Sequence, residues 1–271
     1  MWTWHSPPNI DGEAFAAAFS RANLNDDVAT FDPSEFEQNV MSQLIIGFLI
    51  LSGVLQGAAS ALGSTRGEWG LVVGFLVVGA GIVIQQIFHN ETWKELGLTA
   101  PIGRGIWAAL FLAAVLLVLG YVLAGGAIEL VPAAPWLLLG VFAQGGIAEE
   151  LVFRGYLFGH IRRTRPFWKA TLISAIPFAL VHFALVLTLP WTIALTAIAM
   201  SVVMTFPLSW LYELGGRTIW APAVLHTVLQ AVPKLIMLDS ATFQIGWMVG
   251  GMIVAWSAFI VRRECVVDVR E

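Results

Sequence analysis

Charged residues are scarce in this chain: they make up 12% of its 271 residues, whereas a soluble domain carries about 25%. Hydrophobic residues make up 58%, and the mean hydropathy is +0.80. This composition argues against a globule that faces water on all sides. The single cysteine, Cys265, excludes an internal disulfide, and the six residues after it exclude a prenylation box. The sequence also lacks long-period repeats and low-complexity tracts.

What the chain has instead is long apolar runs. Windows of about 20 residues with few charges predict eight membrane-spanning helices, and therefore an all-α, polytopic integral membrane protein. Pro207, Pro222 and Pro233 interrupt the two runs between 191 and 237, and membrane helices tolerate proline where neighbours satisfy the freed carbonyls. The expected spans are 41–62, 69–88, 105–124, 135–159, 168–188, 191–211, 218–237 and 242–261.

The distribution of lysine and arginine agrees with eight spans. An even number of spans places both termini and the even-numbered connections on one side, which then holds eleven of the fourteen basic residues. The other side holds Arg66 and Lys234, and the remaining residue is Arg154, inside a span. Because cytoplasmic loops carry the excess of Lys and Arg, we expect both termini in the cytoplasm. The eleven are Arg21, Lys94, Arg104, Arg162, Arg163, Arg165, Lys169, Arg217, Arg262, Arg263 and Arg270.

One apolar span contains three ionisable side chains, in the stretch AEELVFRGYLF. Charges at membrane depth cost roughly 2.5–3.5 kcal/mol each on insertion scales and usually face a protein interior or a water-filled cavity. Glu150 and Arg154 are four residues apart on one helix face, in the favourable acid-before-base order, so we expect a buried ion pair. Glu149 points elsewhere around the helix and needs a partner from another helix or from water.

Two histidines lie in other predicted spans, His182 in IPFALVHFAL and His226 in WAPAVLHTVLQ. A single histidine in an apolar helix is more often a core residue bonded to a carbonyl than a catalyst. Counting about 1.5 Å per residue from Arg162, Lys169 and Arg217 puts Glu149, His182 and His226 roughly 20, 20 and 14 Å from the cytosolic charges. We therefore expect these three groups at similar depth, nearer the cytosolic face than the outer one.

Three motifs in this order resemble the CPBP intramembrane proteases, also called the CAAX-protease or ABI family. EExxxR matches Glu149, Glu150 and Arg154; FxxxH matches Phe178 and His182; and the family's third histidine matches His226. The sequence GRTIWAPAVLH before that histidine is also similar to the family. The family has Asn or Asp four residues after the histidine, whereas this chain has Gln230.

The resemblance implies hydrolysis of a peptide bond near the cytosolic face. Glu149 and His182 would activate water, His226 with Gln230 would stabilise the oxyanion, and Glu150 with Arg154 would orient Glu149. No cofactor is favoured. Zinc remains an alternative, because Glu149, His182 and His226 form a two-histidine, one-carboxylate set, although the sequence has no HExxH. The expected partners are the lipid bilayer and a membrane protein or lipid-anchored peptide as substrate, with no nucleic acid.

Two other functions remain open. The first is a catalytically silent relative that acts as a scaffold or bacteriocin-immunity protein, because the extra methylene of Gln230 displaces the amide. The second is a proton-coupled transporter that uses the buried Glu and His residues, against which the absence of an internal repeat argues. We expect the protein in the cell membrane of a prokaryote. Its predicted parts are an acidic cytosolic extension at 1–40, three helices in 41–132, a five-helix catalytic core at 133–262 and a short cytosolic tail at 263–271.

Overall fold

The computed structural model describes residues 33–62, 67–101, 103–187, 191–238 and 240–262. Contacts divide the chain into residues 1–41 and 42–271, and the description below concerns the second unit. Most of the predicted acidic extension, and the tail that carries Cys265, lie outside the described residues. The first described helix begins at Pro33 and leads into the first predicted span.

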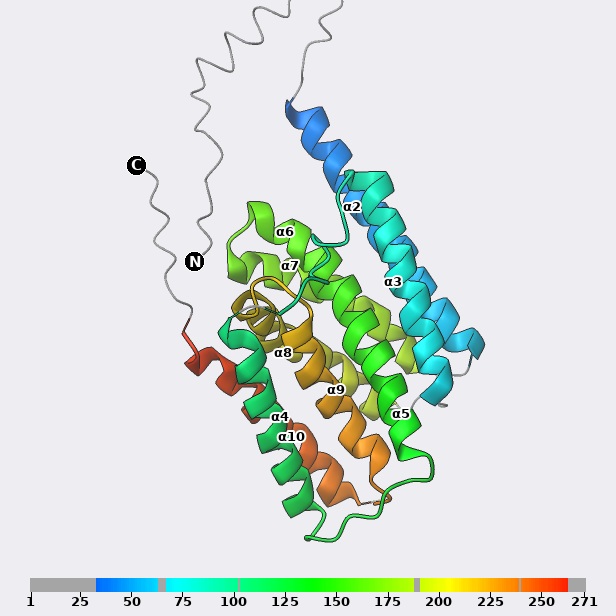
Figure 1. The fold of residues 1–271 in the computed structure, drawn as a ribbon, viewed down its shortest axis with the longest axis vertical. Helices are drawn as coiled ribbons and strands as arrows, with labels where there is room; N and C mark the ends of the chain where they lie inside the picture. Colours follow the sequence, from blue (N-terminus) through cyan, green and yellow to red (C-terminus); the bar gives the residue numbers. More distant parts are fainter. Residues whose placement is uncertain (1–32, 63–66, 102, 188–190, 239, 263–271) are drawn as a thin grey trace, which may run out of the picture. The chain divides into compact units, whose positions relative to one another are not determined.

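The described residues are helical and form no strand beyond one isolated bridge, which confirms the all-α prediction (Figure 1). The predicted fourth span is one continuous helical rod in which two π-helical segments follow α5 and precede α6. The elements are α2 (Pro33–Leu62), α3 (Gly67–His89), α4 (Arg104–Leu123), α5 (Ala134–Val141), η1 (Phe142–Ala148), η2 (Leu151–Phe158), α6 (Gly159–Thr164), α7 (Phe167–His182), η3 (Phe183–Leu187), α8 (Trp191–Leu214), α9 (Trp220–Leu235), α10 (Ala241–Trp256) and η4 (Ser257–Ile260).

Three connections, α3–α4, α6–α7 and α8–α9, meet at one end of residues 42–271. Arg163 NH2 donates to Glu91 Oε2 at 2.8 Å, and the Ile219 N–H donates to the Gly97 carbonyl at 3.0 Å. Partial burial opposes ionisation of Glu91, but the hydrogen bonds from Arg163 outweigh it and hold the pKa of Glu91 below its ordinary value. We call this the basic end, because these residues gather there: Lys94, Arg104, Arg162, Arg163, Arg165, Lys169 and Arg217.

The α4–α5 and α9–α10 connections meet at the opposite end. Leu130 and Ile236 form an isolated antiparallel bridge, and the Val131 N–H donates to the Leu235 carbonyl at 2.9 Å. Lys234 is the basic residue that the structure describes at this end. The three even-numbered connections therefore share one end, and the two odd-numbered connections described here share the other, as the predicted order of spans requires.

Seven helices are long and apolar enough to cross a membrane, one fewer than the eight predicted. The exception is α9, whose 16 residues give about 24 Å of helix, less than the roughly 30 Å of a bilayer core. α9 nevertheless links the two ends, because its first residue follows Ile219 at the basic end and its last bonds to Val131 at the other. The predicted position of this helix is thus right, but its length is not that of a complete span.

Burial identifies the central helix. In the span formed by α4, 28% of the residues in its apolar window are buried. In the span at 134–164, the same share is 56%. Every residue of η2 is buried, although this segment carries Arg154. A helix that is apolar on all sides and enclosed by protein belongs to the core. The motif AEELVFRGYLF therefore lies at the centre of the bundle.

Two apolar clusters meet at this central helix. The first joins α2, α3, η2 and α7, and the second joins α4, α8, α9 and α10. α9 packs against η1, and a Cβ added at Gly146 would lie 2.4 Å from Thr227 Oγ1 of α9. Small residues at such an interface let two helices approach closely. The glycines before the motif thus bring α9 and its histidine against the two glutamates.

Gly155→Ala should destabilise the fold, because a Cβ there would lie 2.3 Å from the backbone carbonyl oxygen of Leu96. Overpacking of this kind typically costs about 1–3 kcal/mol. Gly79→Ala is the matched control, since nothing lies within 4 Å of its added Cβ. In thermal unfolding in detergent, the midpoint of Gly155→Ala should be lower than that of the wild type, whereas the midpoint of Gly79→Ala should equal it. Equal midpoints for the two variants would contradict this packing.

Candidate active site

The expected ion pair between Glu150 and Arg154 is present. Arg154 NH1 lies 3.1 Å from Glu150 Oε1, and the two side chains are 1% and 0% exposed. The Phe178 ring of α7 covers the guanidinium, with its centroid 4.8 Å from Cζ, a contact worth about 0.5–2 kcal/mol. Three buried polar atoms of the pair, Arg154 Nε and NH2 and Glu150 Oε2, have no hydrogen-bond partner among the described residues. The pair therefore depends on few contacts.

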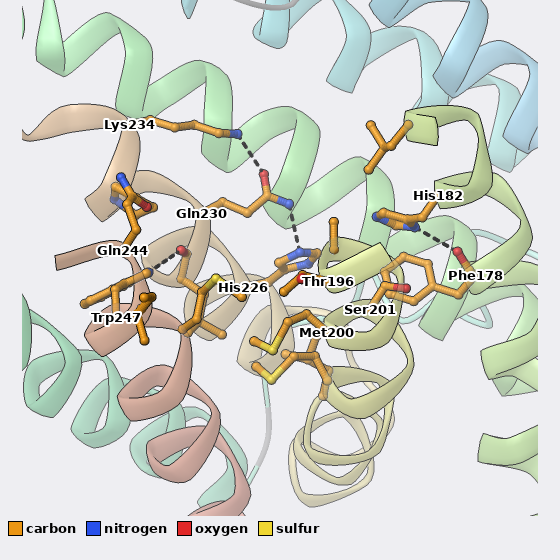
Figure 2. A pocket seen from close by; sticks show the side chains of 18 residues that line it. Phe178, His182, Thr196, Met200, Ser201, His226, Gln230, Lys234, Gln244 and Trp247 are labelled. Carbon is orange, nitrogen blue, oxygen red and sulfur yellow. Dashed lines mark hydrogen bonds between the residues drawn. The ribbon is translucent and has the colours of Figure 1, made fainter. Parts of the chain in front are cut away.

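A third group, His226 of α9, bonds to the same carboxylate oxygen. Its Nδ1 lies 2.5 Å from Glu150 Oε1, and its Nε2 lies 2.8 Å from the Gln230 amide nitrogen. On the far side of that amide, Lys234 Nζ donates to Gln230 Oε1 at 3.2 Å. Figure 2 shows the Lys234–Gln230–His226 part of this series along α9. This series of hydrogen-bonded polar side chains thus links the two apolar clusters.

The chain of contacts assigns the hydrogens of His226. Lys234 can only donate, so the amide oxygen of Gln230 faces it and the amide NH2 faces His226. A carboxylate can only accept, so His226 Nδ1 carries the hydrogen that is donated to Glu150. His226 Nε2 then accepts from Gln230. Glu150 therefore fixes the hydrogen on Nδ1, and Lys234 orients the Gln230 amide so that its NH2 meets Nε2.

Glu149 has a different environment from its neighbour. Its Oε2 lies 3.8 Å from His226 Nε2, and its side chain is 18% exposed, whereas Glu150 is fully buried. That distance is too long for a hydrogen bond, so neither carboxylate oxygen of Glu149 is committed to a direct one among the described contacts. A carboxylate that water can reach, beside an imidazole and an amide, is free to hold a water molecule.

His182 ends α7 and presents one ring nitrogen for chemistry. Its Nδ1 lies 2.8 Å from the Phe178 carbonyl oxygen, which only accepts, so Nδ1 carries the hydrogen. Nε2 is left without a partner in the described contacts and can act as an acceptor. The Phe178 ring packs against the His182 ring at 4.6 Å while covering Arg154, so the phenylalanine of FxxxH supports two site residues at once.

His182 and His226 line one cavity of about 1030 Å³ between α7, α8, α9 and α10 (Figure 2). Its wall is largely apolar, and Gln230 and Lys234 add polar groups on the α9 side. A large apolar cavity with a few convergent polar groups is the usual form of a substrate site. Its remaining walls are formed by Leu185, Thr196, Ala197, Met200, Ser201, Met204, Leu208, Leu229, Pro233, Gln244, Ile245, Trp247 and Met248, with Phe178 beside His182.

Two known groups of proteins are similar to this part of the chain. Residues 130–232, a range that contains both glutamates, both histidines and Gln230, match the family described as type II CAAX prenyl endopeptidase Rce1-like. This match supports the resemblance to the CPBP proteases that the motifs indicate. Over 132 residues, 46% of the chain, the sequence is 27% identical to the Bacillus subtilis (strain 168) protein named "Putative membrane peptidase YdiL". The chain spans about half the length of that relative.

The structure adds two contacts of His226 to those expected from the motifs. Glu150 pairs with Arg154 as expected, and it also binds His226. Glu149 lies 3.8 Å from His226, and its cooperation with His182 through a water molecule stays a prediction. Both contacts of His226 have one cause: packing between α9 and η1 decides which imidazole meets which carboxylate, and sequence spacing does not reveal it.

The expected depth of the CPBP residues also needs correction. His182 was placed nearer the cytosolic charges, but it is the last residue of α7 and lies at the far end of that helix from Lys169. The basic residues used as markers lie at the helix ends, and α7 has only 16 residues, so a count of 13 residues from Lys169 crosses most of the helix. Measured along α7, His182 is therefore nearer the opposite end.

A metal ion does not fit this CPBP site as the chain arranges it. Among the described residues, no group of three or more His, Cys, Asp or Glu side chains is placed to hold one. Glu149 and His226 are neighbours, but His182 has no described contact with either of them. We therefore derive no step through zinc from the set Glu149, His182 and His226.

Lys234 is the site residue that the sequence interpretation missed. It was counted only as an outer-side charge, yet it follows Gln230 at the same four-residue spacing at which Gln230 follows His226. Residues four apart share a helix face, so this spacing was the signal that could have found it.

Lys234→Met should change the hydrogen bond at His226 Nε2, because Lys234 then no longer fixes which end of the Gln230 amide faces the ring. In protein with ¹⁵N-labelled histidine, we expect wild-type His226 to show Nδ1–H and a hydrogen-bonded Nε2, and the variant to show a shifted or broadened Nε2 signal while Glu150 keeps the hydrogen on Nδ1. The chain has five histidines, and a His226→Gln spectrum assigns the signal. Lys94→Met, at an exposed lysine of the basic end, is the control. Identical His226 signals in wild type and Lys234→Met would contradict the assignment.

Proposed function

We propose that the protein is an intramembrane endopeptidase that hydrolyses a peptide bond of a membrane-associated protein or peptide. The observation that carries the proposal is the position of Glu149. Its carboxylate makes no direct hydrogen bond to the described residues and lies 3.8 Å from an imidazole that lines a large apolar cavity. Peptide hydrolysis needs a base that is free to take a proton from water, and Glu149 meets that need. The family match and the named relative support the same activity.

Each residue then has one task. Glu149 takes a proton from water, and the Nε2 of His182 accepts the other hydrogen of that water and orients it. The water oxygen forms a bond to the carbonyl carbon of the substrate, which gives a tetrahedral oxyanion. Cleavage of the C–N bond follows, and the proton held by Glu149 passes to the leaving nitrogen. The products are a carboxyl group and an amine.

Gln230 provides the hydrogen-bond donor for the oxyanion in this scheme. Its amide nitrogen carries two hydrogens, and one is donated to His226 Nε2. The other is available to the cavity, which Gln230 lines. His226 Nε2 acts as an acceptor, so the ring positions the amide instead of donating to the oxyanion itself. Removing one donor of this kind typically costs about 10²–10³ in rate. The extra methylene of Gln230 is thus compatible with function when Lys234 fixes the amide.

Cleavage should not require a bound transition metal, because Glu149 can take the proton from water itself, and among the described residues no three His, Cys, Asp or Glu side chains are placed to hold an ion. Protein purified in chelator should keep its activity, and elemental analysis should find far less than one zinc per chain. Loss of activity on chelation and its return with Zn²⁺ would instead make Glu149, His182 and His226 ligands.

The experiment that tests the function compares membranes from cells that carry the wild type or Glu149→Ala. Mass spectrometry of new protein termini should find one or more fragments in the wild type whose uncut precursor accumulates in the variant. Glu129→Ala, which removes an exposed glutamate at the opposite end, is the control and should match the wild type. If the three membranes have the same termini, the silent scaffold or immunity protein becomes the better explanation.

A further inference from the structure

A second, much smaller cavity lies across α9 from the substrate cavity. The large cavity lies among α7, α8, α9 and α10, whereas the small one, of about 40 Å³, lies among α3, α5, η1 and α9. Gln230 and Lys234 of α9, both visible in Figure 2, line both cavities and so form the wall between them. The small cavity is also lined by Gly67, Leu137, Gly140, Val141, Gln144 and Gly145.

The small cavity is suited to water. A cavity needs about 10–15 Å³ and two to four polar partners to hold one water molecule. This one provides about 40 Å³ and the polar side chains of Gln144, Gln230 and Lys234. Gln144 is half-buried, and its amide makes no hydrogen bond to the described residues. It therefore offers the cavity both a donor and an acceptor.

The π-helical segment η1 brings Gln144 into line with Glu149. The Glu149 N–H donates to the Gln144 carbonyl, which is the five-residue spacing of a π-helix. In an α-helix, residues five apart point about 140° away from each other around the axis, whereas a π-turn places them one above the other. Gly145 leaves room beside them, because a Cβ there would lie 2.6 Å from Gln230 Oε1. Gln144 therefore lies one turn from the proposed base and lines the same small cavity as Gln230.

A water supply separate from the peptide cavity has a physical reason. Each cleavage consumes one water molecule, whose OH joins the carbonyl carbon and whose other hydrogen goes to the leaving nitrogen. A peptide that fills the large cavity expels the water there, and the largely apolar wall offers few groups to hold any. The next water molecule then needs another polar route to Glu149.

We propose that the small cavity holds the water that the site consumes, and that Gln144 passes it to Glu149. This inference rests on the proposed peptidase activity and specifies where its second substrate is bound. Gln144 is a positioning residue in this scheme, because it holds the water and takes no proton from it. Gln230 and Lys234 supply the other hydrogen bonds.

Infrared spectroscopy of a nitrile probe tests the water site directly. Cys265→Ser removes the single native cysteine, and Leu137→Cys in that background, converted to the thiocyanate, places a nitrile in the small cavity. Leu76→Cys, at an exposed leucine in the middle of α3, is the matched control that faces the lipid chains. We expect the Leu137→Cys band at the higher frequency of a water-bonded nitrile and the Leu76→Cys band at the lower frequency of apolar surroundings. Equal frequencies would overturn the proposal.

Gln144→Leu tests the supply role. The change keeps the approximate size of the side chain but removes both polar groups. We expect the Leu137→Cys band to move to the lower frequency, and kcat to fall by about 10–10²-fold with KM unchanged. Gln144→Asn keeps an amide and should retain more of kcat than Gln144→Leu. Wild-type kcat in Gln144→Leu would overturn the proposal.

Gln86→Leu is the control for the loss of a glutamine side chain. Gln86 is exposed near the basic end of α3 and bonds to Asn90, so this variant should match the wild type in kcat and in the nitrile band. The infrared readout does not need catalysis, so the two proposals can fail separately. A water-bonded nitrile in a protein that cleaves no peptide would refute the peptidase and the supply role with it. Cleavage by a protein whose small cavity is dry would refute the supply role alone.

Discussion

Glu150→Leu should lower the free energy of unfolding by about 3–5 kcal/mol, the cost of removing one partner from a buried charge pair. Arg154 is 1% exposed, and its Nε and NH2 already lack hydrogen-bond partners among the described residues. Removing the carboxylate leaves this guanidinium with the Phe178 ring alone. It also removes the acceptor for His226 Nδ1. Thermal unfolding of purified protein in detergent should show a markedly lower midpoint.

The double variant Glu150→Leu/Arg154→Leu is the control for this prediction. It removes both charges together, and apolar replacements of a buried pair are often neutral or stabilising. It should therefore be more stable than Glu150→Leu, even though it contains one more substitution. If the double variant is instead the less stable of the two, Arg154 does not depend on Glu150, and the pair has been misassigned.

Glu149→Gln should reduce cleavage by at least about 10²–10⁴-fold, the usual contribution of a general base, and leave the fold intact. The amide is nearly isosteric with the carboxylate but cannot take a proton from water. Glu149 is partly exposed and makes no direct hydrogen bond within the part of the chain that the structure describes, so its change should alter stability by no more than about 0.5 kcal/mol. The measurement is kcat on a peptide that spans the identified cleavage site, together with the unfolding midpoint.

The pair of adjacent glutamates thus provides its own comparison. Glu149→Gln should lose activity at constant stability, whereas Glu150→Leu should lose stability together with activity. Equal destabilisation by both changes would mean that the two carboxylates share one structural role. An active Glu149→Gln protein would exclude Glu149 as the base and leave His182 as the remaining candidate.

Contacts within one helix could be predicted from the sequence, because helix geometry fixes them. Glu150 with Arg154, and His226 with Gln230, are each four residues apart, and both contacts are present. The spans were also readable, since an apolar run of about 20 residues has few alternatives to a membrane helix. α9 was predicted too long, because the flanking apolar residues of the 218–237 run belong to irregular connections at the two ends.

Contacts between helices could not be predicted in the same way. Gly145 and Gly146 determine how closely α9 approaches the helix that carries Glu150. This close approach places His226 within hydrogen-bond distance of Glu150. The π-helical segments on both sides of Glu149 and Glu150 have no signature in the residue pattern, yet they are typical of functional sites. The position of the cavity depends on which portions of four helices stay apart, and that is a property of the packing.

Hydrolysis of the identified peptide in H₂¹⁸O by purified protein tests the central claim most directly. The account predicts that the wild type cleaves the peptide and places one ¹⁸O in the new carboxyl group, and that Glu149→Gln, folded to the same stability, forms no product. A folded wild-type protein that leaves the peptide uncut, or a Glu149→Gln protein that cleaves it at the wild-type rate, would contradict the account.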